Sequence, residues 1–579
     1  MAATKMQWKI GGEAGFGIMT AGLVLSKSFT RAGYHAFGYT EYPSLIRGGH
    51  NTYQTTISAE KTGAPIKAVH VLVALNRETI DLHKAELSEG AAVIYDSEKM
   101  QAVQDEPGRE TRLVPVPFSK IAKEVAGLEL MSNNVALGAS MAVLNHDIEL
   151  LLGVIKDQFK GKGEDIITKN LGSAKAGYDY VKKNFPEPFK YALQKPNKPE
   201  TKLLMTGNEA VGLGAIAAGC KFYAGYPMTP TSNILNFMAA NERKYGLIVK
   251  QAEDEISVIN MAIGAGFAGT RAMVATSGGG FCLMTEGYGL AGMTETPVVI
   301  VMGQRGGPST GLPTWTEQAD LKFVLNAAHG EFPRIVVAPG DMEELFYWTM
   351  KSFNLAEKYQ TPVILLTDKH LCESHASVDK LDAKAVKIDR GEIVKEQVAN
   401  YKRYALTETG VSPRALPGQK GNIFIANSDE HDETGLSTED AAMRNAMMDK
   451  RMRKLQYAEK DIGAEGAKVY GPKRADITLI GWGSTKGAIL DAMKTLVEQG
   501  INANVLHIIA ASPFPTEAVS KALRARKPKL MIENNYSGQM AAVIREKTGI
   551  EIKHKLLKYD GRPIYPEEIV EEVKKVLKE

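Results

Sequence analysis

The sequence predicts a multidomain α/β protein whose mainly parallel sheets are covered by helices. The chain has 579 residues, of which 44% are hydrophobic, and about 150 residues per domain gives three or four domains. Short runs of apolar residues recur along the chain, and each is followed by a glycine-rich or polar turn and then by a helical pattern. Because strand, crossover helix and strand form one parallel unit, this alternation favours parallel sheets with helices on their faces.

The C-terminal region shows this unit most clearly. Residues 477–480 have the pattern of a strand, 481–487 of a loop, the next stretch of a helix through Leu496, and 505–508 of a second strand. Similar units surround two earlier segments, 271–303 and 334–368.

Two polar stretches predict the domain boundaries. Residues 186–202 are rich in proline and lysine and are typical of a linker. A longer charged stretch separates the central units from the C-terminal one. We therefore expect three domains and a connector, at residues 1–190, 200–380, 381–469 (the connector) and 470–579.

Charge and cysteine content exclude several function classes. The net charge is +3 with no long basic block, so nucleic-acid binding has little support. The three cysteines, Cys220, Cys282 and Cys372, form no CxxC pair, which argues against a disulfide framework and against a zinc or iron-sulfur site in this chain. No apolar run approaches about 18 residues and the N-terminus lacks a cleavage pattern, so we expect a cytoplasmic protein without a membrane span.

Two N-terminal glycine motifs are candidate contacts. The segment GGEAGFG does not have the spacing GxGxxG, so we disfavour nicotinamide binding and prefer a tight turn or another contact. In YPSLIRGGHN, Arg47 and His50 flank a Gly-Gly turn. Arg47 is either a solvated surface residue or, because glycine lets backbone approach closely, a ligand contact.

The central segment AGYPMTPTSN combines rigidity with hydroxyl groups. Pro227 and Pro230 fix φ on either side of Thr229, which suits the recognition of an anion. The alternative is an ordinary helix start with Thr229 or Thr231 as its N-cap. Both can hold together, because a helix N-terminus itself favours anions.

Three acidic residues, Glu253, Asp254 and Glu255, precede the next helix. They are either partners of the helix dipole, or one of them is buried to share a proton with a cofactor nitrogen. Along the helix, the apolar side chains are expected on one face and small residues keep another part of it slim, which predicts close packing. The apolar positions are Ile256, Ile259, Ile263 and Phe267; the small ones are Gly264, Ala265, Gly266 and Ala268.

The segment GQRGGPSTGLPT leads from a predicted strand into a loop. Arg305 there could bind a carboxylate through its two-pronged guanidinium, and the alternative is a solvated loop arginine. Thr314 lies in the same loop.

Taken together, the chain resembles the alpha subunits of 2-oxoacid:ferredoxin oxidoreductases in which a gamma-type domain is fused ahead of the pyrimidine-binding domain. The resemblance covers nearly the whole chain. It is carried by GGEAGFG and TEYPSLIRGGHN, by GNEAVGLGAIAAGCKFYAGYPMTPTSN, EDEISVINMAIGAGFAG, TSGGGFCLMTEGYGLAG and GQRGGPSTGLPT, and by IENNYSGQM. It implies a gamma-type domain, a thiamine diphosphate pyrimidine-binding domain and a transketolase C-terminal-like domain.

The resemblance also implies residue roles. Thr229, with Tyr226 and Pro227, would lie against thiamine diphosphate and the carboxylate of the 2-oxoacid, although Met228 replaces the usual isoleucine. Glu255 would hydrogen-bond the aminopyrimidine ring, with Glu253 as the less favoured neighbour.

Further roles concern the substrate. Arg305 would bind the substrate carboxylate, Thr314 would line the pocket, and Arg47 would reach the far end of the substrate. For residues 429–433 we expect only proximity to the site.

By the same resemblance, the reaction is the coenzyme A-dependent oxidative decarboxylation of a 2-oxoacid, with electrons passing to ferredoxin. Two separate arginines suit a dicarboxylate, so 2-oxoglutarate is favoured over pyruvate or branched-chain 2-oxoacids. The sequence has no GDG motif followed by Asn at the spacing used to hold magnesium and diphosphate. We therefore expect a beta subunit with Mg²⁺ and a 4Fe-4S cluster, in a dimer of alpha-beta heterodimers. A non-catalytic assembly subunit and a non-redox thiamine transferase are the alternatives.

Overall fold

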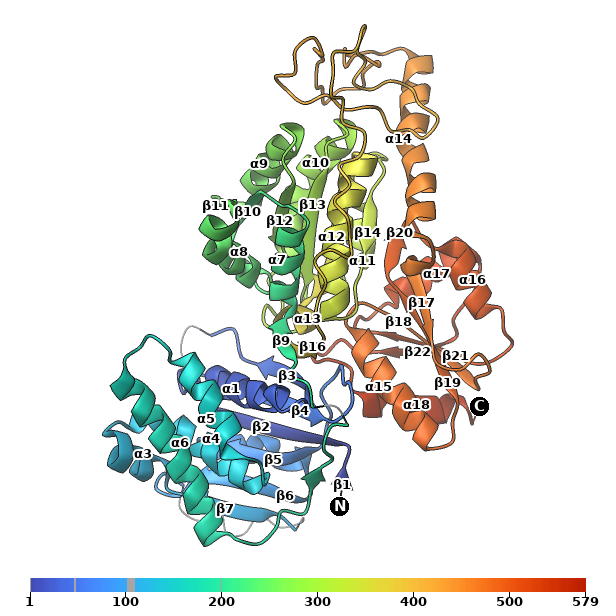
Figure 1. The fold of residues 1–579 in the computed structure, drawn as a ribbon. Coiled ribbons are helices and arrows are strands. Elements are labelled where there is room, and N and C mark those ends of the chain that lie inside the picture. The colour runs from blue at the N-terminus through green and yellow to red at the C-terminus, as the bar shows by residue number, and fades with distance from the viewer. Residues whose placement is uncertain (1, 46–47, 101–109, 198, 579) are drawn as a thin grey trace. The chain divides into compact units, whose positions relative to one another are not determined.

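The computed structural model describes residues 2–45, 48–100, 110–197 and 199–578. The chain forms two compact units (Figure 1). The first comprises Met1–Met205, Glu373–Lys380 and Tyr565–Glu567, and the second Thr206–Cys372, Leu381–Ile564 and Glu568–Glu579.

The first unit is built on a mixed eight-stranded sheet. In sheet order its strands are β7 (Arg112–Val116), β6 (Leu87–Asp96), β5 (Val69–Ala74), β2 (Lys5–Glu13), β4 (His50–Ser58), β3 (His35–Glu41), β16 (His375–Val378) and β9 (Leu203–Thr206). The strands β2, β5, β6 and β7 run parallel, whereas β4 pairs antiparallel with β2 and β3. Two short strands, β1 (Ala2–Ala3) and β8 (Ala192–Leu193), form a separate pair.

Helices cover the apolar face of this sheet. Trp8 and Ile10 of β2 alternate inward and pack with Phe29 and Leu137 in one core cluster. The helices on this face are α1 (Ile18–Arg31), α3 (Phe118–Ala126), α4 (Ser132–Val143), α5 (Ile148–Gln158) and α6 (Glu164–Asn184). Ile80 of α2 (Arg77–His83) packs with Leu72 of β5 in a cluster on the other face. The 3₁₀ turns η1 (Lys84–Glu86) and η2 (Glu129–Met131) follow α2 and α3.

The second unit contains a seven-stranded sheet that is parallel except for its last strand. In order, its strands are β11 (Ile248–Gln251), β10 (Phe222–Gly225), β12 (Ala272–Thr276), β13 (Val298–Gln304), β15 (Pro362–Asp368), β14 (Ile335–Val337) and β20 (Ala510–Ser512). The central strands β13 and β15 are buried along their whole length, as their valine- and isoleucine-rich sequences require for a sheet covered on both faces. Its helices are α7 (Gly207–Ala217), α8 (Ser232–Tyr245), α9 (Glu255–Phe267), α10 (Gly278–Met293), α11 (Leu321–Asn326), α12 (Met342–Tyr359) and α13 (Lys369–Glu373).

A five-stranded sheet completes the second unit. In order, its strands are β17 (Ala467–Tyr470), β19 (Ala503–Ile508), β18 (Ile477–Trp482), β21 (Lys529–Glu533) and β22 (His554–Leu557). Only β17 runs antiparallel to its neighbour. The accompanying helices are α15 (Thr485–Glu498), α16 (Thr516–Leu523), α17 (Gln539–Thr548) and α18 (Pro566–Val576). Trp482 of β18 and Met531 of β21 share one core cluster with Val274 of the seven-stranded sheet.

The connector is irregular up to Asp440, whose side chain caps α14 (Ala441–Ile462) by accepting from Met443 N. The 3₁₀ turn η3 (Gly463–Gly466) then leads to β17, and Figure 1 shows α14 as a long orange helix between the irregular coil and the five-stranded sheet.

Buried charges tie the connector to the seven-stranded sheet. Glu295 is fully buried and accepts from Lys450 Nζ at 2.6 Å and Lys454 Nζ at 2.5 Å. Arg403 donates to the backbone oxygen of Glu295 at 2.8 Å. Burial lowers the pKa of Lys454 to about 7, although Glu295 opposes this shift.

The structure confirms the predicted fold class and the β-α-β unit over β18, α15 and β19. The domain boundaries stay a prediction. None of the described helices combines the length and hydrophobicity that a membrane crossing requires.

Replacing Glu295 by glutamine should strongly destabilise the second unit. Lys450 and Lys454 would remain buried without their carboxylate, and loss of one partner of a buried ion pair costs about 3–5 kcal/mol. Chemical denaturation measures this cost. The matched control is Glu465→Gln, which breaks a partly exposed pair with Lys351 and should cost less than about 1 kcal/mol; equal costs would contradict the prediction.

The first unit should lose stability in mild acid. Burial lowers the pKa of His50, His70, His146 and His375 to about 4, below the ordinary value of 6.5. The unfolded chain therefore binds more protons between pH 6.5 and pH 4, and the free energy of unfolding falls as the pH is lowered through this window.

Urea denaturation at pH 7, 6 and 5 measures this loss, with Trp8 fluorescence followed in a variant whose other three tryptophans are phenylalanine. His146 packs between the rings of Phe29 and Tyr34, so His146→Phe keeps the packing and should make the pH dependence shallower. An unchanged slope in that variant would contradict the assignment.

Candidate active site

The carboxyl ends of three neighbouring parallel strands meet at one edge of the seven-stranded sheet. The register pairs Gly225 of β10 with Ala275 of β12, and Thr276 of β12 with Met302 of β13. The loops that follow these strands therefore start side by side. This is where open α/β sheets bind their ligands.

The loop after β10 is fixed by hydrogen bonds on both of its sides. Thr231 N and Ser232 N donate to Met228 O at 2.9 and 3.1 Å. From α7, Asn208 Nδ2 donates to Pro230 O at 2.8 Å. Thr231 occupies the N-cap position of α8 but makes no side-chain cap, since its hydroxyl donates to Met228 O instead. The loop therefore has hydrogen bonds of its own in addition to leading into α8.

Arg305 and Thr229, which the sequence singles out separately, come into direct contact. Arg305 Nη1 donates to Thr229 O at 2.8 Å. The approach depends on Gly303 in β13, because a Cβ there would lie only 2.7 Å from Thr231 Cγ2. The predicted carboxylate-binding arginine therefore holds the loop in place.

The structure distinguishes the three acids before α9. Asp254 is the N-cap and accepts from Ser257 N at 2.9 Å. Glu253 is exposed, whereas Glu255 is 2% exposed. Only Glu255 therefore has the burial that the proton-sharing interpretation requires.

Glu255 faces the end of β12. Thr276 Oγ1 donates to Glu255 Oε1 at 3.4 Å and contacts Met228 Sδ at 3.9 Å, which joins the acid to the loop after β10. A Cβ at Gly280 of α10 would lie 2.3 Å from Glu255 Oε1 and 2.1 Å from Thr276 Oγ1, so glycine leaves the space that these groups fill.

Two further acids lie near Arg305, and the sequence did not single them out. Burial raises the pKa of Asp320 to about 6; Glu317 raises it further and Arg305 opposes the shift. Glu317 accepts from Gly307 N at 3.1 Å. No spacing signal in the sequence brings Asp320 beside a residue 15 positions earlier, since only the folded loop does so.

Thr314 lies in the loop that begins at Arg305. The base of this loop is closed by Gly306 N donating to Trp315 O at 3.1 Å and by Leu312 N donating to Gly306 O at 2.9 Å. Thr314 is 5% exposed, and among the described residues no group bonds to its Oγ1.

The remaining site predictions concern Tyr226, Pro227, Arg47 and residues 429–433. Tyr226 is 41% exposed, and Pro227 is exposed as well. Arg47 lies outside the described residues. Within residues 429–433, Glu430 pairs with Arg451 at 2.7 Å and Glu433 with Lys402 at 2.6 Å, so these acids bind cations of the connector.

Apolar side chains are exposed beside Glu255. Ile256 and Met261 of α9 and Leu283 of α10 are 50%, 44% and 47% exposed. Ile256 is exposed, whereas Ile259 and Ile263, which the apolar pattern places on the same face of α9, are buried.

The two glycines of α9 differ in their surroundings. A Cβ at Gly266 would lie 2.3 Å from Pro297 O, so its smallness serves packing within the chain. At Gly264 no described atom lies within 4 Å of such a Cβ. Of the two, only a bulky substitution at Gly264 would therefore test a contact at the surface of the chain without disturbing its internal packing.

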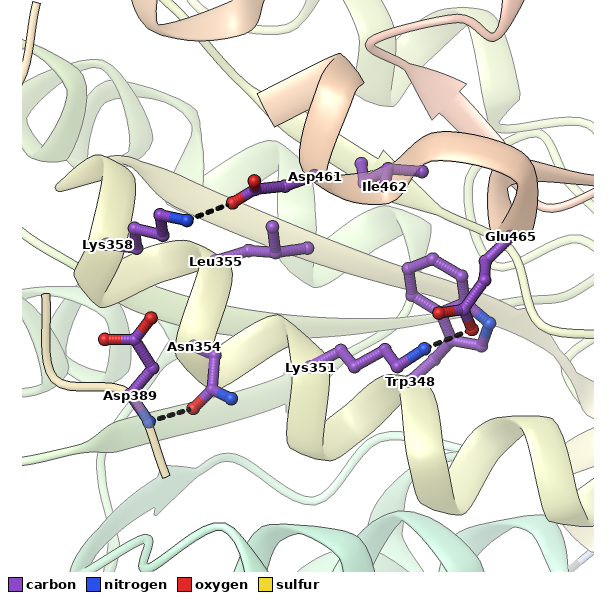
Figure 2. A pocket seen from close by; sticks show the side chains of 9 residues that line it. All are labelled: Trp348, Lys351, Asn354, Leu355, Lys358, Asp389, Asp461, Ile462 and Glu465. Atoms are coloured by element: carbon purple, nitrogen blue, oxygen red, sulfur yellow. Dashed lines mark hydrogen bonds and ion pairs between the residues drawn. The ribbon is translucent and has the colours of Figure 1, made fainter. Parts of the chain in front are cut away.

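A separate cavity of about 210 Å³ lies between α12 and the end of α14 (Figure 2). Its cations are already paired, Lys358 with Asp461 and Lys351 with Glu465, and Asn354 accepts from Asp389 N at 3.0 Å. These pairs join α12 to the connector, and the cavity contains none of the predicted site residues.

Three family models match successive parts of the chain. "Pyruvate ferredoxin/flavodoxin oxidoreductase" matches residues 7–180. "Pyruvate flavodoxin/ferredoxin oxidoreductase, thiamine diP-bdg" matches residues 213–450, which contain the site described above. "Pyruvate:ferredoxin oxidoreductase core domain II" matches residues 475–569.

Relatives align over the full length. The 2-oxoacid:ferredoxin oxidoreductase subunit alpha of Sulfolobus sp is 37% identical over 631 residues, covering 99% of this chain and 97% of the relative. The chain belongs to the 2-oxoacid:ferredoxin oxidoreductase alpha-subunit family. Another family member, the 2-oxoglutarate synthase subunit KorA of Methanothermobacter thermautotrophicus, is 34% identical and covers 64% of this chain and 97% of its own length.

A solved structure of the family has the same fold. It is the 2-oxoglutarate:ferredoxin oxidoreductase from Magnetococcus marinus with 2-oxoglutarate, coenzyme A and succinyl-CoA bound. The TM-score is 0.94 at 34% identity, and the match covers 99% of this chain and 100% of that chain.

The cofactor that the family implies fits this edge of the sheet. The chain offers a buried carboxyl group, that of Glu255, whose Oε1 accepts from Thr276 Oγ1 in the space that Gly280 leaves beside it. At the end of β12, Ser277 Oγ is buried, and no described group bonds to it. A polar ligand at this edge would supply the partner that Ser277 Oγ lacks.

Replacing Gly280 by alanine should weaken thiamine diphosphate binding by about ten-fold or more, because the added methyl displaces Glu255 and Thr276 and such overpacking costs about 1–3 kcal/mol. Titration calorimetry on the cofactor-free complex measures the affinity. The control is Gly279→Ala in the same helix turn, where no described atom lies within 4 Å of the new Cβ. Equal affinities of the two variants would sink the prediction.

Proposed function

We propose that the chain is the alpha subunit of a 2-oxoglutarate:ferredoxin oxidoreductase, which converts 2-oxoglutarate and coenzyme A to succinyl-CoA and CO₂ and passes electrons to ferredoxin. The observation that carries this proposal is the joint placement of a buried acid and a cation: Thr276 links Glu255 to the loop after β10, and Arg305 bonds to Thr229 O in the same loop.

The choice of substrate is supported by the relatives. The Magnetococcus structure contains 2-oxoglutarate and succinyl-CoA, and the KorA relatives are named 2-oxoglutarate synthase subunits. The full-length Sulfolobus relative is named only for 2-oxoacids, so pyruvate is the second candidate.

Glu255 is proposed to hold the proton that the cofactor needs. Thiamine diphosphate, when bound, supplies a carbon nucleophile and accepts the electron pair released as CO₂ leaves. Glu255 Oε1 accepts from Thr276, which leaves Oε2 to share a proton with a nitrogen of the aminopyrimidine ring. Thr229, Tyr226 and Pro227 would form the adjoining wall.

Arg305 is proposed to bind the carboxylate beside the reacting carbonyl. Its Nη1 already donates to Thr229 O, and the guanidinium has further N–H groups for a bidentate contact. Thr314, buried in the same loop, would line the pocket. Arg47 stays the proposed contact for the far carboxylate of 2-oxoglutarate.

The chain is proposed to work with a beta subunit that supplies Mg²⁺ and the 4Fe-4S cluster, in a dimer of heterodimers. The exposed side chains of Ile256, Met261 and Leu283 beside Glu255 suit such a contact, since apolar groups exposed together mark interaction surfaces. The domains are proposed at 1–190, 200–380 and 470–579, with the connector at 381–469.

The test is coenzyme A-dependent reduction of ferredoxin or a viologen dye by the complex purified from its native cell, with 2-oxoglutarate and pyruvate compared. A higher kcat/KM for 2-oxoglutarate supports the proposal. A higher kcat/KM for pyruvate would contradict the choice of 2-oxoglutarate as the substrate. Absence of any activity with an iron-bearing partner present discards the enzyme assignment in favour of an assembly role.

Replacing Glu255 by glutamine should lower kcat by about 10²–10⁴-fold, the usual contribution of a positioned acid or base, because the amide cannot exchange the proton. Single-turnover kinetics with 2-oxoglutarate measures it. The control is Glu253→Gln, at an exposed position, which should retain activity; a Glu255→Gln complex as active as this control would overturn the role.

A further inference from the structure

The C-terminal five-stranded sheet holds the loop that carries Arg305 and Thr314. Thr316 N donates to Gly561 O at 3.1 Å. Gln318 N donates to Asn534 O at 2.6 Å, and Gln318 O accepts from Asn535 Nδ2 at 3.1 Å. The chain just after Trp315, at Thr316 and Gln318, is therefore hydrogen-bonded to the segments that follow β21 and β22.

Arg562 stacks on the side chain at the base of this loop. Its guanidinium carbon lies 3.8 Å from the centre of the Trp315 ring. The stack is prearranged, because Arg562 N donates to Asp560 Oδ1 and Nη1 to Asp560 O, each at 2.9 Å. A planar guanidinium over an indole combines cation–π attraction with stacking.

The neighbouring Gly561 lets the backbone come this close. Its φ is +82°, and a Cβ there would lie 2.9 Å from Trp315 Cβ and 3.2 Å from Leu312 Cδ1. Trp315 and Leu312 are the residues whose backbone groups close the loop onto Gly306, the neighbour of Arg305. Contacts thus run without a break from Arg562 through Trp315 to Gly306.

We propose that Arg562 is a positioning residue for substrate binding: by stacking on Trp315 it fixes the 306–315 loop and thereby the placement of Arg305 and Thr314. This inference rests on the proposed function and deepens it, because the C-terminal sheet then contributes to the affinity for the 2-oxoacid. The group recognised is the carboxylate that all 2-oxoacids share, so Arg562 acts alike on every 2-oxoacid substrate.

The first experiment measures kcat and KM of Arg562→Ala in the purified complex with 2-oxoglutarate and with pyruvate. We expect KM to rise by about three- to ten-fold for both substrates, with kcat changed less than about two-fold, since only the placement of the carboxylate site is lost. The control is Arg545→Ala, which removes an exposed arginine of α17 that pairs with Glu551.

Two results would overturn the proposal. A rise in KM for 2-oxoglutarate alone would mean that Arg562 binds the far carboxylate itself. Full rescue by Arg562→Lys would mean that charge is sufficient, whereas the stack requires the planar guanidinium. Trp315→Ala should raise KM as Arg562→Ala does, and the double variant should be no worse than either single one.

A second measurement is independent of activity. Trypsin cleaves after Arg305 only when the loop opens locally, so Arg562→Ala should speed the appearance of the fragment that begins at Gly306 by about three-fold or more, and Arg545→Ala should not. An unchanged rate of cleavage after Arg305 in Arg562→Ala would reject the proposal that Arg562 fixes the loop. If the wild-type complex oxidises no 2-oxoacid, the proposed function fails while this measurement still decides the role of Arg562.

Discussion

The parallel register of β10, β12 and β13 is the constraint on which the site depends. It brings Gly225, Thr276 and Gln304 to one edge of the sheet, although up to 79 positions separate them in the chain. Each strand end then delivers one chemical group: a rigid loop, a hydroxyl and a guanidinium. The contacts between these groups, such as Arg305 to Thr229 O, follow from that register and need only small local adjustments by Gly303 and Gly280.

Different forces hold the surrounding parts in place. The strands are fixed by apolar burial, with Val274 and Ile300 inaccessible to solvent. The connector is also held by buried charges, since Lys450 and Lys454 both pair with Glu295. Because these charges must be desolvated, the cluster adds little net stability. Leaving one of them buried without its partner is nevertheless costly, so the cluster strongly favours this one arrangement. The irregular chain before α14 is thereby given one position.

The sequence predicts the helices and strands better than it predicts which residues contact one another in the folded chain. Alternating apolar bursts and glycine turns revealed the β-α-β units, and motif order pointed to Thr229, Glu255 and Arg305. Without the resemblance, the residues left open which of the three adjacent acids is buried, because a one-position shift on a helix turns a side chain by about 100°. The sequence also showed no sign of Asp320 beside Arg305 or of Arg562 on Trp315, since both contacts join segments through loops whose course no periodicity specifies.

The acids beside Arg305 have a physical consequence for substrate affinity. Arg305 is partly buried, which lowers its pKa, and Asp320 opposes that shift. Near pH 7 Asp320, with a pKa of about 6, is mostly ionised, and its charge opposes the approach of the carboxylate that Arg305 is proposed to bind. Under the proposed function this weakens ground-state binding without lowering kcat, because affinity shared equally by substrate and transition state does not raise kcat.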